Sequence, residues 1–198
     1  MNRTDICNMA LSIVSRQRID SLEDTSEEAK ICATYYEHTR RRILKMYNWG
    51  FARHLDKLAL RNQTIPGWDF CYGYPQGCLT VQLVFEENNA RQREMERQDF
   101  QIITLTGNDK VIATDVPLAW AEYTYDVTNT ESFSEEFVEA LTRMLAANIA
   151  IPLTSNSDLM NMNMQLAQQA INIAMQESAV EQERRMKWPR KYEGARFM

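Results

Sequence analysis

Hydrophobic residues recur at the spacing of an α-helix in four parts of the chain, two near each end. In the first part they stand at i, i+3, i+4, i+7 and i+8, as Ile6, Met9, Ala10, Ile13 and Val14. This spacing places apolar side chains on one face of a helix. Along the whole chain, the pattern predicts helices at residues 3–15, 26–48, 133–151 and 157–187.

Capping residues suggest where these helices begin and end. Thr25 and Glu28 have the spacing of a capping box, in which two side chains satisfy free backbone N–H groups of the first turn. Gly50 is a candidate for the left-handed residue that ends the second helix. Pro152 lacks a backbone N–H, so we expect the third helix to stop there.

Between residues 51 and 130 the hydrophobic period changes from about 3.6 to 2, which is typical of β-strands. Residues 79–85 alternate most clearly, and the turn at residues 107–109 predicts a hairpin. Pro and Gly are frequent in residues 62–77, which we expect to be irregular. The strongly charged residues 86–99 are predicted to be an exposed excursion. The predicted strands lie at residues 58–60, 79–85, 101–106, 110–114 and 119–127.

Together these elements predict an α+β fold that is mainly α. Helices from both ends of the chain would form a four-helix bundle, with a β-rich insertion at residues 51–130. Residues 1–187 would make a single domain, and the non-periodic residues 188–198 would extend from it as a C-terminal tail. A chain of 198 residues is long enough for one domain with a sizeable core.

The composition is that of a folded protein, but the charge is unevenly distributed. Hydrophobic residues make up 44% and charged residues 25%, so disorder is not expected. The net charge is −5. Residues 184–198 carry six cations against Glu193 and so hold +5, which leaves −10 on residues 1–183. An acidic chain is poorly suited to wrapping duplex DNA, because Lys and Arg supply most of that affinity.

The basic end also contains three aromatic residues, which makes it a candidate docking segment. Apolar anchors beside cations suit binding in an acidic groove of a partner. The simpler alternative is a chain end without a partner. The candidate docking residues are Arg184, Arg185, Lys187, Trp188, Arg190, Lys191, Tyr192 and Phe197.

Residue types that serve catalysis or metal binding do not form recognisable motifs. The four cysteines include no C-x-x-C pair, and neither His38 nor His54 has metal-ligand spacing to a cysteine. The six glycines form no nucleotide-binding pattern. We therefore expect no enzymatic activity, cofactor or metal. The N-terminus lacks a secretory signal and no apolar run approaches the ~20 residues of a membrane span, so we expect a cytosolic protein without a membrane partner.

Four cations in the second predicted helix support an alternative function. Arg40, Arg41, Arg42 and Lys45 could contact nucleic-acid phosphates together with the basic tail. Consecutive helical residues point about 100° apart, so three arginines in a row surround a helix instead of forming one patch. A solvated or subunit-bridging face is the simpler interpretation.

The order of these parts resembles a known family. The segments NMALSIV, IDSLEDTSEEAKICATYYEHTRRRILKMYNWGFA and GWDFCYGYPQGCLTVQLV are similar to the head-to-tail adaptor of short-tailed bacteriophages, the tail tubular protein A family. The resemblance covers residues 8 to about 151. Its most specific pieces are the end of the second helix and the GWDFCYGYP stretch. The packing residues in these pieces are Trp49, Phe51, Trp68, Tyr74 and Pro75.

The resemblance implies a structural protein of the virion. It implies a twelve-subunit ring between the portal protein and the tail nozzle protein, which extends the DNA channel and completes head-to-tail joining after packaging. Genomic DNA would pass through the channel during ejection without sequence-specific binding. The protein would assemble in the host cytoplasm and lie at the head–tail junction.

The same resemblance implies roles for parts of the chain. The fourth helix and the tail would face the portal, and the β-rich insertion would meet neighbouring subunits or the nozzle. Trp49 and Phe51 would wedge the end of the second helix against the first strand, which would fix the angle between the sheet and the helices.

Overall fold

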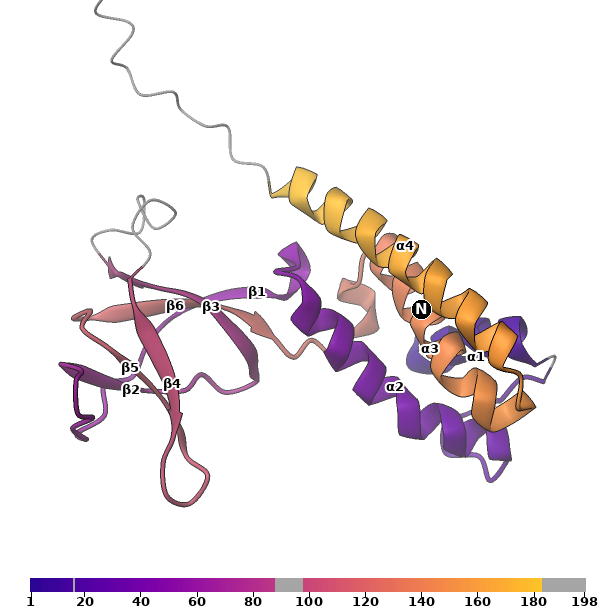
Figure 1. Ribbon diagram of the computed structural model, residues 1–198, viewed down its shortest axis with the longest axis horizontal. Helices are drawn as coiled ribbons and strands as arrows, with labels where there is room; N and C mark the ends of the chain where they lie inside the picture. Colours follow the sequence, from indigo (N-terminus) through magenta and orange to yellow (C-terminus); the bar gives the residue numbers. More distant parts are fainter. Residues whose placement is uncertain (16, 88–97, 183–198) are drawn as a thin grey trace, which may run out of the picture.

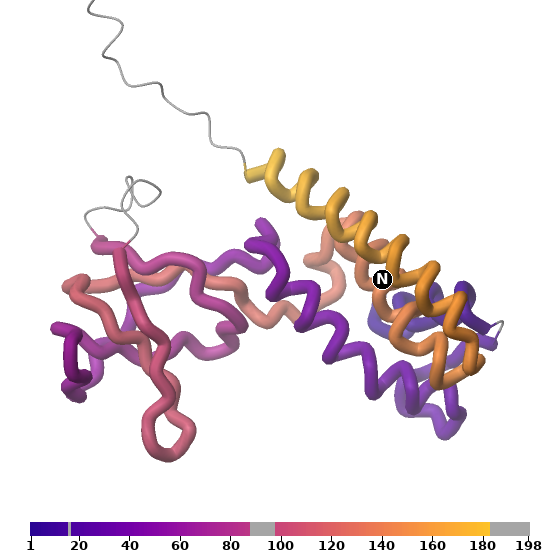
Figure 2. The backbone as a smooth tube through the Cα atoms, in the orientation of Figure 1, coloured from indigo at the N-terminus to yellow at the C-terminus, as the bar shows by residue number. Residues whose placement is uncertain are grey.

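The computed structural model describes residues 1–15, 17–87 and 98–182, and it has an elongated α+β architecture (Figure 1). In this part of the chain four α-helices lie at one end of the molecule and two small antiparallel sheets at the other. The tube in Figure 2 passes from the helices along α2 into the strands, and it returns to the helices after β6. The predicted α+β class is confirmed.

The helices of the described residues are packed around α3. This helix contacts α1, α2 and α4, whereas α1 and α2 touch each other only slightly. All four predicted helices are present, although their bounds differ by a few residues. The helices are α1 (Arg3–Val14), α2 (Glu27–Met46), α3 (Glu135–Thr154) and α4 (Ser157–Glu181).

The central position of α3 explains its apolar sequence. Among the described helices, α3 alone has the length and mean hydropathy, 1.2, that would suit a membrane span. However, 61% of its most apolar window is buried inside the protein. Its hydrophobic surface is therefore covered by the neighbouring helices, as expected for a core helix.

Two helix ends of α2 differ from the predictions. The N-cap is Ser26, whose hydroxyl accepts a hydrogen bond from the N–H of Ala29, so the predicted cap at Thr25 was wrong by one residue. At the other end the helix stops at Tyr47, which is extended. Gly50 is not left-handed, because the chain has already left the helix and turns through the short 3₁₀-helix η1 (Gly50–Ala52).

The predicted end of α3 at Pro152 was also wrong. Proline lacks the N–H that would bond to the carbonyl of Asn148, but this loss affects only one bond in the last turn. The helix continues to Thr154 and ends at Ser155, whose φ is 52° and whose N–H donates to the carbonyl of Ile151 at 2.9 Å. A left-handed residue is a common way to end a helix.

The C-terminal predictions lie partly outside the described residues. The helix α4 ends at Glu181, and its predicted continuation to residue 187 begins beyond residue 182. The tail at residues 188–198, with all eight candidate docking residues, is also outside the described part of the chain. The docking role of this segment stays a prediction.

Among the described residues, six strands form two three-stranded sheets, and each of these pairings is antiparallel. The first sheet has the order β1-β6-β3 and the second has the order β2-β5-β4. The strand predicted at residues 79–85 is present as β3, and the predicted hairpin is present as β4 and β5. The strands are β1 (Arg53–Lys57), β2 (Phe70–Gly73), β3 (Cys78–Glu86), β4 (Phe100–Thr104), β5 (Lys110–Thr114) and β6 (Ala119–Tyr125).

Two strand predictions were wrong. The first strand lies at Arg53–Lys57, before the predicted residues 58–60, and four of its five residues are exposed, so it has no clear apolar alternation. The strand β2 lies in the segment predicted to be irregular. It is four residues long and pairs with β5, which is far away in the sequence, so its hydrogen bonds come from tertiary pairing. Of the predicted excursion at residues 86–99, residues 88–97 are outside the described chain.

The two ends of the molecule have separate hydrophobic cores. The helical core includes the buried residues of α1, α2 and α3 together with Trp49. The sheet core is smaller and gathers residues such as Tyr72, Val84 and Ile112. Tyr125, at the end of β6, packs against both cores. Packing around Tyr125 therefore helps to set the orientation of the helical end relative to the sheet end.

Candidate interaction surfaces and the joint between the two ends

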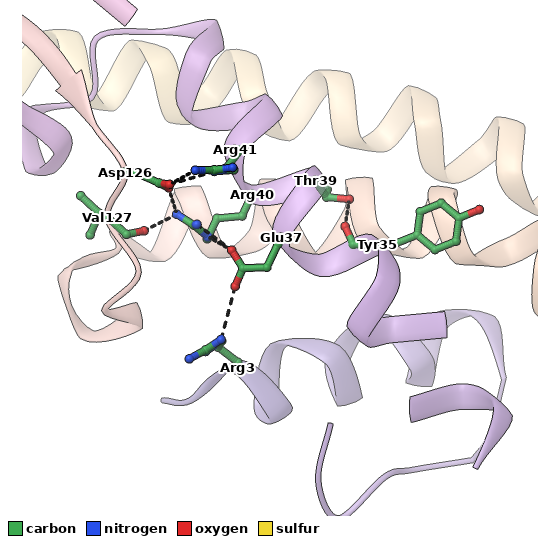
Figure 3. Close-up of polar contacts among 8 residues, drawn as sticks. All are labelled: Arg3, Tyr35, Glu37, Thr39, Arg40, Arg41, Asp126 and Val127. Carbon is green, nitrogen blue, oxygen red and sulfur yellow. Dashed lines mark hydrogen bonds and ion pairs between the residues drawn. The ribbon is translucent and has the colours of Figure 1, made fainter. Parts of the chain in front are cut away.

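A buried arginine joins α2 to the segment that leaves β6. Arg40 is 1% exposed, and its guanidinium lies 2.7 Å from the carboxylate of Asp126. The same guanidinium donates a hydrogen bond to the carbonyl oxygen of Val127 and lies 2.7 Å from a carboxylate oxygen of Glu37. Glu37 in turn lies 3.3 Å from Arg3 of α1 (Figure 3). One ionic network thus connects α1, α2 and the link from β6 to α3.

Arg41 brings a second guanidinium to the same carboxylate. Its Nε donates to Oδ2 of Asp126 at 2.8 Å, and this hydrogen bond raises the pKa of Arg41. Burial raises the pKa of Asp126, but the hydrogen bonds from Arg41 and then Arg40 outweigh that effect and leave the pKa below its ordinary value. Asp126 is therefore a charged anchor for both arginines at neutral pH.

This arrangement bears on the predicted nucleic-acid contact. Arg40 is buried and Arg41 is bound to Asp126, so two of the four cations in this part of α2 already have protein partners. Arg42 and Lys45 are exposed. These two neighbouring cations are the part of the predicted contact that stays exposed on α2. The other half of the hypothesis, the basic tail, lies outside the described residues.

A second polar network links the C-terminal ends of α2 and α4 to the first sheet. The side-chain amide of Asn48 donates to Glu122 of β6 at 2.7 Å. The side-chain amide of Gln182 donates to the backbone carbonyl of Asn48 at 2.9 Å. Arg53 of β1 donates to the amide oxygen of Gln182 at 3.2 Å. Through Gln182, the C-terminal end of α4 is thereby held against Asn48, which follows α2, and Arg53, which begins β1.

The rings of the predicted aromatic wedge pack against α3. The indole N–H of the fully buried Trp49 donates to the carbonyl of Ile43 at 3.0 Å. Its ring centroid lies 5.1 Å from that of Phe137 in α3, and the ring of Phe51 lies 5.0 Å from Phe137 and 5.6 Å from Phe133. Edge-to-face packing of this kind favours one defined arrangement of the rings. The wedge therefore fixes the end of α2 on the start of α3.

The other three predicted packing residues lie in the sheet end of the molecule. Trp68 is half-buried, and its indole N–H donates to the side chain of Gln101 at 3.3 Å. The ammonium group of Lys110 lies 5.6 Å from the ring centroid of Tyr74. Pro75 and Tyr74 line one side of a shallow hollow. The structure thus separates these three residues from Trp49 and Phe51.

Two apolar surfaces lie at opposite ends of the described molecule. A groove of about 380 Å³ lies between α3 and α4, where apolar side chains of α4 face three carboxylates at the start of α3. A hollow of about 300 Å³ lies on the sheet end, and its rim includes Leu60 and Leu118, which are 65% and 60% exposed. Exposed apolar patches of this kind often mark sites of protein association.

The structure describes the histidines and thiols that the sequence analysis considered as candidate chemical groups. His38 is exposed on α2, and the ring of His54 stacks on Tyr125 at 4.5 Å. The thiols of Cys7 and Cys32 are buried and hydrogen-bonded to each other, and this bond together with burial raises the pKa of Cys7. Within residues 1–15, 17–87 and 98–182, no group of three or more His, Cys, Asp or Glu could hold a metal ion.

Several residues of the joint were not identified in the sequence analysis. Asp126 and Gln182 follow the ends of elements and Glu122 is the middle residue of β6, and their partners lie 74 to 134 positions away in the sequence. The interpretation of Arg40 as part of a solvated or subunit-bridging face was wrong, because Arg40 is buried. One pattern could have indicated this, because Arg40 lies four residues after the buried Tyr36 and three before the buried Ile43. A cation on the apolar stripe of a helix indicates a buried ionic partner.

No protein-family model matches the chain, and the search of curated proteins found no match. The resemblance to the tail tubular protein A family thus depends on the three quoted segments alone.

Proposed function

We propose that this protein is a structural adaptor that forms a ring between the portal protein and the tail nozzle protein of a short-tailed bacteriophage. In this proposal the four helices act as one bundle and the two sheets project from it. The ring, of twelve subunits by family analogy, would extend the DNA channel. It would form in the host cytoplasm and remain in the virion.

The observation that best supports the proposal is the pair of unlike apolar surfaces at the two ends of the molecule. A closed ring is built from heterologous contacts, in which one face of a subunit meets a different face of its neighbour. The groove between α3 and α4 has an acidic rim, whereas the hollow at Leu60 and Leu118 is mostly apolar. In the proposed ring, the hollow meets a neighbouring subunit or the nozzle, and the α4 side faces the portal.

The joint between the two ends gives further support. A ring closes only if each subunit is rotated by the same angle relative to its neighbour. This requires the two contact surfaces of a subunit to keep a fixed orientation relative to each other. The ionic network at Arg40 and the aromatic packing at Trp49 hold the helical end, and Tyr125 packs on both cores. Such a joint suits a subunit whose two ends must keep a fixed angle. The −10 charge on residues 1–183 also suits a channel wall that makes few lasting contacts with DNA phosphates.

The decisive experiment mixes the full chain with portal rings encoded by the same phage genome at about physiological salt. Electron microscopy of the mixture and of the protein alone should show a second ring stacked coaxially on the portal. Images of the protein alone also reveal whether rings form before the portal is present. If the protein stays separate from the portal at micromolar concentration, the adaptor proposal is wrong. Titration with duplex DNA at low and high salt would then test the nucleic-acid alternative.

A variant lacking residues 188–198 tests the docking tail. We expect it to fold normally and to attach more weakly to the portal. The matched control replaces Trp188, Tyr192 and Phe197 with Ser, which keeps the length and charge of the segment. Weaker attachment in both variants would identify the aromatic side chains as anchors. Full attachment of the truncated chain would show that the tail is not a docking element.

A further inference from the structure

The groove between α3 and α4 combines apolar walls with a negative rim. Its apolar side comes from α4, where Leu166, Ala170 and Ile173 occupy one face. Ile173 is 55% exposed and lies beside Leu166 and Ala170, so the three side chains form a partly exposed apolar patch. The rim across from it carries Glu135, Glu136 and Glu139, whereas Arg143 is the one cation among the described residues that line the groove. Arg143 is already bound to Glu139 at 2.8 Å.

The apolar face continues from the groove to the end of α4. Leu166, Ile173 and Val180 are spaced seven residues apart, so they lie along one side of the helix. Val180 is 67% exposed and stands two residues before Gln182, the last described residue. An uncovered apolar track therefore leads from the point where residues 183–198 begin back into the groove.

The sequence of residues 184–198 matches this surface in charge and in polarity. It contains six cations and one carboxylate, which complements the acidic rim. It also contains Trp188, Tyr192 and Phe197, and such large aromatic side chains favour apolar pockets when cations beside them face acidic groups. The complementarity is specific to this end of the chain, because residues 1–183 have a net charge of −10.

We infer that the groove between α3 and α4 is the docking site for residues 184–198 of the same chain. Ile173 lies nine residues before Gln182, which is roughly 14 Å along the helix. Fifteen residues of extended chain span up to about 50 Å, so the segment reaches the whole groove. A short tether also gives the segment a local concentration on the order of millimolar, which favours its own groove over that of a second copy.

This contact lies within one chain and does not rest on the proposed function.

Photo-cross-linking of the full chain, without portal, tests the contact directly. Trp188 is replaced by p-benzoylphenylalanine, and equal amounts of isotopically heavy and light chains are mixed before irradiation. Mass spectrometry then identifies the fragments that are joined and whether they carry the same label. We expect residue 188 to be joined to fragments that contain residues 135–143 or 166–173 and that have the same isotopic label.

Two substitutions in α4 make the test specific. Ile173→Asp places a charge in the groove, so the cross-linking yield should fall roughly tenfold, as expected for losing the burial of one large apolar side chain. Met162→Asp is the matched control, because Met162 is 50% exposed on the same helix but does not line the groove. Its yield should not change.

Other outcomes would overturn the inference. Cross-links between heavy and light chains would show that a second copy occupies the groove. Cross-links that persist in the Ile173→Asp chain, or that fall on other surfaces, would show that the segment binds elsewhere or nowhere. Because no portal is present, any of these results leaves the adaptor proposal to be judged by its own experiment.

Discussion

The guanidinium of Arg40 lies 2.7 Å from the carboxylate of Asp126, in a position where the arginine is 1% exposed and the aspartate side chain is 15% exposed. This pair connects the middle of α2 to the strand-to-helix link at the boundary of the two cores. Burying an ion pair costs desolvation energy, which is recovered only when further hydrogen bonds satisfy both groups. Here Val127, Glu37 and Arg41 provide those bonds.

Replacing Arg40 by Met should lower the free energy of unfolding by about 3–5 kcal/mol. The substitution keeps much of the apolar stem but leaves the carbonyl of Val127 without its donor. Arg41→Met is the matched control, since Arg41 binds the same carboxylate but its side chain is 56% exposed, and exposed pairs contribute up to about 1 kcal/mol. Urea unfolding followed by circular dichroism measures both. If Arg40→Met and Arg41→Met lowered the unfolding free energy equally, the buried ion pair would contribute no more stability than the exposed one.

The pKa of Asp126 predicts how this contribution depends on pH. Its pKa in the folded protein is lower than in the unfolded chain, so the unfolded chain takes up the proton first as pH falls. The stabilisation is complete above the unfolded value of about 3.9 and is lost as pH falls through the folded value. The difference in unfolding free energy between the natural chain and Asp126→Asn should therefore be constant from pH 7 to about 5 and shrink below about pH 4. A difference that grew on acidification would have the wrong sign.

Trp49 is expected to be the most sensitive aromatic residue in the helical core. Trp49→Ala removes a fully buried indole and should lower the unfolding free energy by about 3–5 kcal/mol. Trp49→Phe keeps a ring but leaves the carbonyl of Ile43 without the indole N–H, so about 1–3 kcal/mol should be lost. Trp68→Ala is the comparison, because Trp68 is half-buried in the sheet end. A loss within about 0.5 kcal/mol for Trp49→Ala would contradict the packing described above.

Local patterns predicted the helices well because their hydrogen bonds and apolar stripes are formed within each segment. The hairpin at residues 107–109 was predicted because a short turn joins its two paired strands. Residues 79–85 were predicted from their apolar alternation, although their pairing partner, β6, is distant in the sequence. The strand β2 was missed because it has only four residues, lies among the Pro and Gly residues of the segment 62–77, and shows no clear apolar alternation. Its formation depends on pairing with β5, about 40 positions away. Loss of the bond from Pro152 did not end α3, because a single missing bond in a last turn is outweighed by the burial of the rest of the helix.

The joint could be predicted only in part. Arg40 was interpreted as part of a solvated or subunit-bridging face, although its position on the apolar stripe of α2 is typical of a cation with a buried partner. Nothing in the sequence identifies that partner as Asp126, which lies 86 residues away. The wedge residues Trp49 and Phe51 were correctly singled out as packing residues. Their packing partner was predicted to be the first strand, because that strand follows them in the sequence, and it is Phe137 of α3 because the helical core closes over them.

The last prediction concerns Gly77, which lies against Tyr125 at the boundary between the two cores. Its φ is 71°, and a Cβ atom there would stand 2.4 Å from the Tyr125 ring. Gly107 has a φ of 87° but open space around it, so Gly107→Ala measures the backbone cost alone, about 1–2 kcal/mol. Gly77→Ala should cost about 1–3 kcal/mol more, because the ring that packs on both cores must move. Urea unfolding of both variants gives the difference, and equal costs would show that Tyr125 yields freely and does not hold the two ends together.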